Sequence, residues 1–236
     1  MDQPVVVTRE KELAILTLNR PERRNAINEA LLKALYDGIE QVTNDDGIKV
    51  AIITGNGKAF CSGLDLDCLA TDNLMNPRGD GLDMVDLMAA CPKPVIGAVN
   101  GYAITGGFEL ALNCDFLIAS EEAAFADTHA RVGIRPGWGM TQLLQQAVGQ
   151  RLAKQFSLTC QFISAEKALA CGLVNEVVKP EKLLPRAREI ADMICQVNFD
   201  MALTVKKLIE DRNRVTLAEA LARERKPLKE MIKGLT

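Results

Sequence analysis

The stretch NGYAITGGFELALNCD, residues 100–115, begins with an Asn-Gly turn and continues as an apolar segment with helical character. Thr105 can cap a helix whose first residues are Gly106 and Gly107, although glycine is a poor helix former. A helix usually starts with two glycines where another group must lie close to its backbone. The free N–H groups at such a helix start bind an oxyanion readily. A tight turn required only by packing is the alternative, and the stretch alone leaves both open.

Glu109 falls in the first turns of this predicted helix, where a carboxylate also interacts well with the helix dipole. Its sequence neighbours are apolar, which predicts a desolvated carboxyl group with a raised pKa. Such a group is the usual general acid or base of an enzyme. We therefore favour the catalytic interpretation of Glu109 over a purely capping role.

A second turn, KAFCSGLDL at residues 58–66, follows a predicted strand and bends sharply at Gly63. One more backbone N–H at this bend could complete an oxyanion hole with two donors. The sequence alone does not show that the two turns meet, so their contact is an expectation for the structure.

Outward from these turns, the hydrophobic pattern alternates between strand and helix periods. The predicted strands are at 5–8 and 14–18 (a hairpin), 50–54, 94–99, 116–119 and 173–178. The predicted helices follow Asn28 as an N-cap, begin near 106, and span 81–90, 141–148, 150–158, 164–170, 182–195, 199–211 and 216–231. This order predicts an α/β core followed by a helical region. Periodicity does not separate a doubly wound sheet from a spiral of strand-strand-helix turns.

Composition narrows the class of protein. The net charge of the 236 residues is -3, which argues against a nucleic acid partner. The seven cysteines are odd in number and lack C-x-x-C spacing, so reduced thiols in a cytosolic core are expected. The N-terminus has no basic region and no long apolar run, so we expect no signal peptide, no membrane span and a cytoplasmic location.

Missing motifs narrow the chemistry further. The single histidine, His129, excludes zinc sites built from several histidines. No P-loop pattern occurs, and Gly55-Asn56-Gly57 lacks the third glycine of a dinucleotide site. Cys61 and Ser62 lie outside a G-x-S-x-G elbow, which disfavours covalent catalysis. No metal is expected.

Five motifs together make the chain resemble the enoyl-CoA hydratase/isomerase (crotonase) superfamily. They are LNRPERRNAIN (18–28), GKAFCSGLDL (57–66), KPVIGAVNGYAITGGFELALNCDF (93–116), PGWGMTQLL (136–144) and ISAEKALACGLVNEVV (163–178). The resemblance implies a crotonase-like spiral of repeated ββα units over residues 1–182 and a helical trimerisation region over residues 183–236. It also implies a homotrimer or a dimer of trimers, and an acyl-CoA thioester whose coenzyme A is part of the substrate rather than a separate cofactor.

The positions that match the family motifs indicate which residues would form the site. The resemblance implies that the backbone N–H groups of Leu64 and Gly106 form the oxyanion hole for the thioester carbonyl. The segment around Ser62 and Gly63 would touch the adenine through its backbone. Two basic side chains would either approach the nucleotide or form a solvated surface pair: Arg23 and Arg24.

The chain departs from the family pattern at the second catalytic carboxylate. Family hydratases carry two glutamates around the catalytic water, and Glu109 matches the first. His129 stands at the second position, within FADTHARVGIRPG (125–137). A histidine can hold or relay a proton near neutral pH, and lining the pocket is the alternative. Asp127, two residues away on an extended segment, would share its face and is a weaker candidate for the missing acid.

The end of the chain is the second departure. Many relatives continue into another helix where this chain stops, soon after LAEALARERKPLKEMIK (217–233). The resemblance therefore implies that closure of the coenzyme A site is short or absent.

The resulting hypothesis is an enoyl-CoA hydratase-like lyase. Glu109 would orient or deprotonate water for attack at C3 of a 2-enoyl-CoA, the two backbone donors would stabilise the enolate, and C2 would take a proton from the same water or from His129. The alternatives are double-bond isomerisation of a 3-enoyl-CoA, another crotonase-type cleavage, and a non-catalytic acyl-CoA-binding protein.

Overall fold

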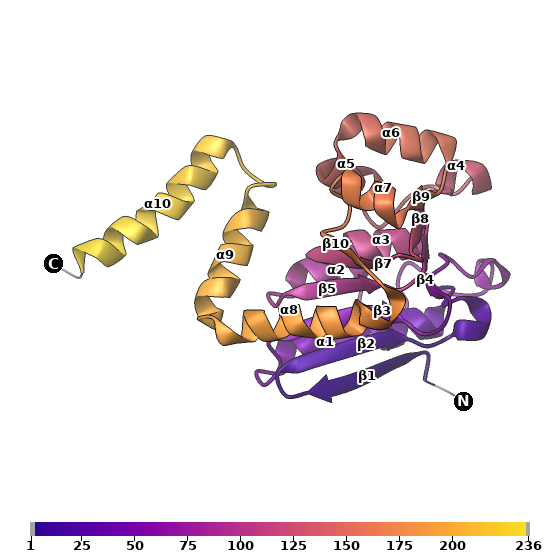
Figure 1. Cartoon of the computed structure of the whole chain (residues 1–236), viewed down its shortest axis with the longest axis horizontal. Helices are drawn as coiled ribbons and strands as arrows, with labels where there is room; N and C mark the ends of the chain where they lie inside the picture. Colours follow the sequence, from indigo (N-terminus) through magenta and orange to yellow (C-terminus); the bar gives the residue numbers. More distant parts are fainter. Residues whose placement is uncertain (1–2, 235–236) are drawn as a thin grey trace.

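The computed structural model describes residues 3–234, and Figure 1 shows two sheets wound together with helices around them. The larger sheet has the order β1-β2-β3-β5-β7-β10, and the smaller has the order β4-β6-β8-β9. The strands are β1 (Val5–Glu10), β2 (Leu13–Leu18), β3 (Val50–Gly55), β4 (Ala59–Cys61), β5 (Val95–Val99), β6 (Tyr102–Ile104), β7 (Phe116–Ser120), β8 (Ala124–Ala126), β9 (Ile163–Ser164) and β10 (Glu176–Val178). The sequence analysis expected the C-terminal segment that closes the coenzyme A site to be short or absent. Residues 235–236 of that segment lie outside the described residues.

Three successive turns of the chain each give one strand to the larger sheet and the next strand to the smaller one. The pairs β3 and β4, β5 and β6, and β7 and β8 follow this rule, and each new strand pairs in parallel with its counterpart from the previous turn. A helix follows each of these pairs. The architecture is therefore the spiral of ββα units rather than the doubly wound sheet.

Helices fill the rest of the described chain. They are α1 (Glu29–Asn44), α2 (Met84–Ala90), α3 (Gly106–Leu112), α4 (His129–Val132), α5 (Met140–Val148), α6 (Gln150–Thr159), α7 (Ala165–Ala170), α8 (Leu183–Gln196), α9 (Phe199–Asp211) and α10 (Leu217–Lys233), with short 3₁₀ turns η1 (Pro21–Arg23), η2 (Leu66–Cys68) and η3 (Pro180–Lys182). The Asn28 side chain caps α1 by accepting from the Leu31 N–H at 3.0 Å, as predicted.

Two predicted boundaries were wrong for local reasons. The helix predicted from residue 81 starts at Met84, because Asp83 and Asp86 form a capping box there. The strand predicted over 173–178 is confined to 176–178, because the preceding residues form the turn that leaves α7.

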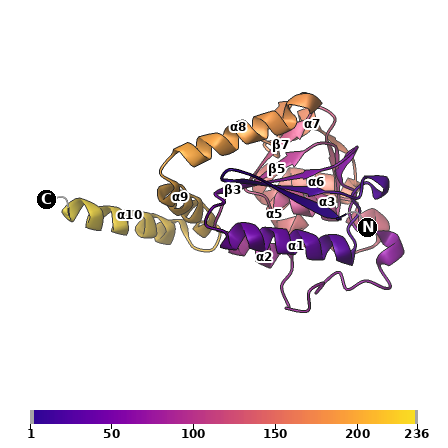
Figure 2. The ribbon, with the colours of Figure 1, turned by 90° about the horizontal axis from the view of Figure 1, so that it is seen from below.

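The larger sheet separates two apolar layers. One face packs on α1 and the main core, while the other is covered by α8, whose Ala187 and Ala191 are buried against the strands. Figure 2 shows α8 on one side of the sheet and α1 with α2 on the other. Beyond α8, the helices α9 and α10 project away from the sheets and bury no residue. The division of the chain at residue 183 coincides with the start of α8 and stays a prediction.

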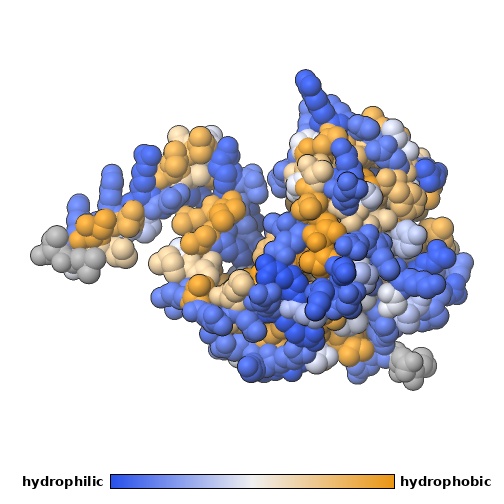
Figure 3. Space-filling model, viewed as in Figure 1, coloured by the Kyte–Doolittle hydropathy of each residue, from blue (hydrophilic) through white to orange (hydrophobic). Residues whose placement is uncertain are grey.

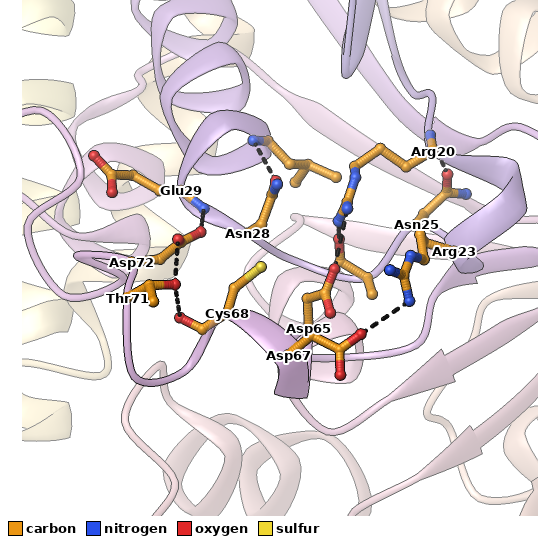
Figure 4. Close-up of polar contacts among 12 residues, drawn as sticks. Arg20, Arg23, Asn25, Asn28, Glu29, Asp65, Asp67, Cys68, Thr71 and Asp72 are labelled. Atoms are coloured by element: carbon orange, nitrogen blue, oxygen red, sulfur yellow. Dashed lines mark hydrogen bonds and ion pairs between the residues drawn. The ribbon is translucent and has the colours of Figure 1, made fainter.

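Polar contacts fasten the irregular segment 69–83 onto α1. The Asp72 carboxylate accepts from the backbone N–H of Glu29 at 2.9 Å, at the start of the helix (Figure 4). Arg78 forms ion pairs with three carboxylates and lies over the Tyr36 ring at 5.8 Å. The partners of Arg78 in these ion pairs are Asp37, Glu40 and Asp80. The segment consequently has a defined position beside the site described next.

Candidate active site

The two glycine bends lie against each other. Gly63 has φ +92°, and a Cβ placed on it would lie 2.9 Å from the Ile104 carbonyl oxygen and 3.5 Å from the Gly106 nitrogen. Both the left-handed backbone and the close approach of β6 require glycine at this position. The start of α3 and the bend after β4 therefore meet at one place.

Each of the two bends has a backbone donor that no hydrogen bond within its own element uses, at a residue that lines one cavity. The Ile27 N–H donates to the Gly63 carbonyl at 2.7 Å, and the Asp65 N–H donates to the Ile27 carbonyl at 2.8 Å. Because N–H directions alternate along an extended chain, the Leu64 N–H points away from Ile27. Gly106 is the first residue of α3, where N–H groups have no partner within the helix. Leu64 and Gly106 both line the cavity.

The capping role predicted for the Thr105 side chain was wrong. Thr105 precedes α3, but it has φ +51° and ψ -111°, whereas a capping side chain needs an extended backbone. Its hydroxyl is instead hydrogen-bonded to the Thr128 hydroxyl and accepts from the Thr128 N–H at 3.3 Å. This link ties the strained residue before Gly106 to the residue before His129.

The cavity has a volume of about 190 Å³. It brings together five residues that the sequence singled out: Ser62, Leu64, Gly106, Glu109 and His129. It also has lining residues that the sequence analysis did not assign to the site: Leu66, Met75, Thr105, Thr128, Val132, Ile134, Arg135, Gly137 and Trp138. Trp138 could have been assigned to the site from the sequence, because a tryptophan between two glycines stands out in PGWG. Met75 lies in the irregular segment, where no sequence pattern marks it as a site residue.

Glu109 is 2% exposed, and one of its carboxylate oxygens is already bonded. Its Oε1 accepts from the backbone N–H groups of Trp138 at 2.8 Å and Met140 at 3.2 Å. Burial raises the pKa of Glu109, and the opposing effects of these backbone donors and of His129 do not cancel it. The Oε2 atom is left facing His129, so Glu109 has one oxygen for proton chemistry.

His129 lies between two carboxylates. Its Nε2 is 3.6 Å from Glu109 Oε2, and its Nδ1 is 2.7 Å from Asp127 Oδ1. His129 is the first residue of α4 rather than part of an extended segment, so Asp127 contacts the imidazole instead of sharing its face toward the cavity. Asp127 is not among the cavity-lining residues.

Arg23 and Arg24 lie near the Ser62 segment but do not line the cavity. The Arg24 carbonyl accepts from the Ser62 N–H at 3.1 Å, while Arg23 forms an exposed ion pair with Asp67 at 3.0 Å. Figure 4 shows Arg23 pointing toward Asp67.

Arg20 and Asn25 support this region, and sequence reasoning missed both. Arg20 pairs with the buried Asp65 at 3.0 Å, as Figure 4 shows. The buried Asn25 amide donates to the carbonyls of Ala59 and Phe60, at 2.8 and 3.1 Å. These contacts hold the strand before the Gly63 bend and the bend itself onto the segment before α1.

Residues 3–234 contain neither a candidate metal site nor a candidate membrane span. No group of three or more histidine, cysteine, aspartate or glutamate side chains in that range could hold a metal ion. Within the same residues, no helix is both long enough and apolar enough to cross a membrane. The seven cysteines are all unpaired.

Comparisons with known proteins agree on one family. The family model described as enoyl-CoA hydratase/isomerase matches residues 8–235. A probable peroxisomal enoyl-CoA hydratase 1 of Arabidopsis thaliana is 39% identical, over 95% of this chain and 84% of that protein. A crotonyl-CoA hydratase of Syntrophomonas wolfei is 41% identical, over 80% of this chain and 75% of that protein. The crystal structure of an enoyl-CoA hydratase from Mycobacterium marinum is similar at a TM-score of 0.90 and 32% identity, covering 98% of this chain and 91% of that one.

Proposed function

Because the chain belongs to the enoyl-CoA hydratase/isomerase family, we propose that its cavity adds water to the double bond of a 2-enoyl-CoA thioester. The observation that carries the proposal is the convergence of two backbone bends beside a buried carboxyl group. Leu64 and Gly106 line the cavity together with Glu109, whose Oε2 is left open by the bonds at Oε1.

Each group has a distinct task in the proposed reaction. The thioester oxygen accepts from the Leu64 and Gly106 N–H groups, which draws electrons from C3. Glu109 Oε2 orients the water and takes its proton as the new C3–O bond forms and the double-bond electrons move onto the thioester as an enolate. The enolate then takes a proton at C2, either the one from the water or one held by His129. Backbone donors of this kind contribute about 3–4 kcal/mol each to transition-state stabilisation.

Turnover of crotonyl-CoA tests the proposal. Hydration removes the conjugated enone absorbance and forms 3-hydroxybutyryl-CoA, which chromatography identifies. Conversion of a 3-enoyl-CoA to its 2-enoyl isomer without hydration would favour isomerisation instead. Tight binding of acyl-CoA thioesters with no turnover across a substrate panel would contradict a catalytic role for the cavity.

The raised pKa of Glu109 predicts the acid side of the pH profile. Glu109 must be ionised to accept a proton, and burial shifts its pKa above the ordinary value of 4.5. We expect kcat/KM for crotonyl-CoA to fall as pH decreases, with a midpoint above that value. A rate profile in buffers of constant ionic strength measures it. A profile that stays flat down to the ordinary glutamate range would contradict the role of Glu109 as the base.

The coenzyme A part of the substrate is assigned to the bend around Ser62. We propose that the backbone of Ser62 and Gly63 contacts the adenine, with Arg23 and Arg24 next to the nucleotide. The support is the family position of these residues and the bond between the Arg24 carbonyl and the Ser62 N–H. Substituting Arg23 and Arg24 with glutamine should raise KM for crotonyl-CoA but not for crotonyl-pantetheine, which lacks the nucleotide.

We propose that α9 and α10 assemble the chain into a trimer or a dimer of trimers. Neither helix buries a residue, and Figure 3 shows apolar side chains on both. A space of about 1050 Å³ lies beside α9, with apolar residues of the helix on one side and of the core on the other. The apolar residues of α9 include Met201, Val205 and Ile209. Those of the core include Val85, Met88 and Leu143. Light scattering should give three or six times the 25.7 kDa chain mass, and a monomer at all concentrations would contradict assembly.

We further propose a cytoplasmic location and hydration without any cofactor beyond the coenzyme A of the substrate. The seven unpaired thiols suit a reducing compartment. The Arabidopsis relative is named as peroxisomal, so cell fractionation is the deciding measurement for location. Activity that survives exhaustive dialysis against a chelator supports the cofactor proposal, and activity that requires an added metal overturns it.

A further inference from the structure

Asp127 holds the only histidine of the chain from two sides. Its Oδ1 accepts from the ring Nδ1 of His129 at 2.7 Å and from the backbone N–H of the same residue at 3.1 Å. Asp127 is 2% exposed. Burial raises the pKa of Asp127, but the lowering effects of His129 and Ser157 outweigh it and leave the pKa below its usual range. Asp127 is therefore a carboxylate, which can only accept.

A carboxylate at Nδ1 determines which ring nitrogen carries the proton. Neutral imidazole has one N–H donor and one acceptor, and an acceptor 2.7 Å from Nδ1 requires that the proton be on Nδ1. The other nitrogen, Nε2, is then an acceptor. It lies 3.6 Å from Glu109 Oε2. Two proton-accepting atoms, one from α3 and one from α4, consequently lie side by side at the cavity.

We propose that Asp127 is a positioning residue that holds His129 in the Nδ1–H tautomer, so that Nε2 is the second proton-accepting group of the hydration site. The inference rests on the proposed function and adds to it the residue that replaces the missing second glutamate. Asp127 itself does not line the cavity. Its effect on the reaction passes through the imidazole.

The arrangement gives the proton a complete path. As water attacks C3, its O–H bond breaks and the proton moves to Glu109 Oε2 or His129 Nε2, while the double-bond electrons form the enolate. When Nε2 takes the proton, the ring becomes an imidazolium between two carboxylates, Asp127 at 2.7 Å and Glu109 at 3.6 Å. The proton then passes to C2, and both side chains return to their starting states. No oxidant or further reactant is needed.

The single histidine makes the tautomer directly measurable. In the wild-type protein labelled with ¹⁵N-histidine, nitrogen NMR contains only the two ring signals of His129, without any assignment problem. We expect the neutral ring to show its protonated nitrogen at Nδ1. A neutral ring protonated at Nε2, or a ring that stays doubly protonated wherever the protein is folded, overturns the proposal. This measurement stands even if the protein does not hydrate crotonyl-CoA, so it separates failure of the inference from failure of the proposed function.

Variants test whether Asp127 acts through the ring. Asp127→Asn should give a mixture of tautomers and lower kcat for crotonyl-CoA by about 10²-fold, with little change in KM. In a His129→Gln background, the same substitution should have no further effect on kcat. Asp46→Asn, at an exposed carboxylate in the turn between α1 and β3, is the matched control and should change neither readout. An Asp127→Asn protein that retains the wild-type tautomer and kcat, or that lowers kcat equally in both backgrounds, contradicts the proposal.

Discussion

Glu109→Gln is expected to lower kcat for crotonyl-CoA hydration by about 10³-fold, within the range that a general base contributes. Glutamine has the same shape and keeps an oxygen for the Trp138 and Met140 N–H groups, but its amide cannot take a proton from water. The two backbone donors at Leu64 and Gly106 are untouched, so thioester binding should remain. Stopped-flow hydration rates and calorimetric titration with a non-reactive acyl-CoA measure the two effects separately.

Stability provides an internal check on the same variant. The folded-state pKa of Glu109 is raised, so the fold favours the protonated carboxyl group and loses stability as pH rises through that folded pKa. Glutamine removes this loss. The melting temperature of Glu109→Gln at neutral pH should therefore be no lower than that of the wild type. A fall in both Tm and kcat would mean that the substitution damages the fold and says nothing about catalysis.

A matched control uses a glutamate without such surroundings. Glu121 is exposed in the turn between β7 and β8, and Glu121→Gln should leave kcat and Tm unchanged. If Glu109→Gln retained kcat within about tenfold of the wild type, the general-base role would be contradicted, because that loss lies below the usual contribution of such a base.

Local signals in the sequence were sufficient for most of the fold. The Asn28 cap, the hairpin and the helix that carries Glu109 depend on neighbouring residues, and the structure has each where predicted. The apolar neighbours of Glu109 also predicted its desolvation correctly. The choice of a spiral over a doubly wound sheet required the family resemblance, since strand pairing is not encoded in periodicity.

Contacts between distant residues could not be predicted from local patterns. Glu109 Oε1 is bonded by the backbone of residue 138, which is 29 positions away, and backbone donors leave no side-chain signature. The Leu64 N–H is turned away from Ile27 by the bridge between these two residues, which are 37 positions apart in the sequence. Thr105 reads as a helix cap, but the left-handed backbone that the bend imposes on it directs its hydroxyl to Thr128. In each case the tertiary contact overrode or supplemented the local preference.

The convergence of the two bends leads to the second large prediction, Gly63→Ala. We expect this substitution to lower kcat/KM for crotonyl-CoA by about 10²–10³-fold, the usual effect of losing one oxyanion donor. The added Cβ would lie 2.9 Å from the Ile104 carbonyl, which belongs to β6 and cannot move aside as a flexible side chain could. The bend must shift instead, and the Leu64 N–H moves with it. Steady-state kinetics measure the loss, and binding of a saturated acyl-CoA should weaken much less.

Alanine at a left-handed position is also unfavourable by itself, by about 1–2 kcal/mol, so a control must separate strain from displacement. Gly81 provides it, because its φ of +80° is similar and a Cβ there would meet nothing within 4 Å. Gly81→Ala should lower Tm modestly and leave kcat/KM unchanged, whereas Gly63→Ala should lower both. If the two variants had equal kcat/KM, the spacing between the bends would not matter for the reaction. Hydration would then depend on Glu109 and His129 without help from the Leu64 N–H, and the assignment of the oxyanion hole would have to be abandoned.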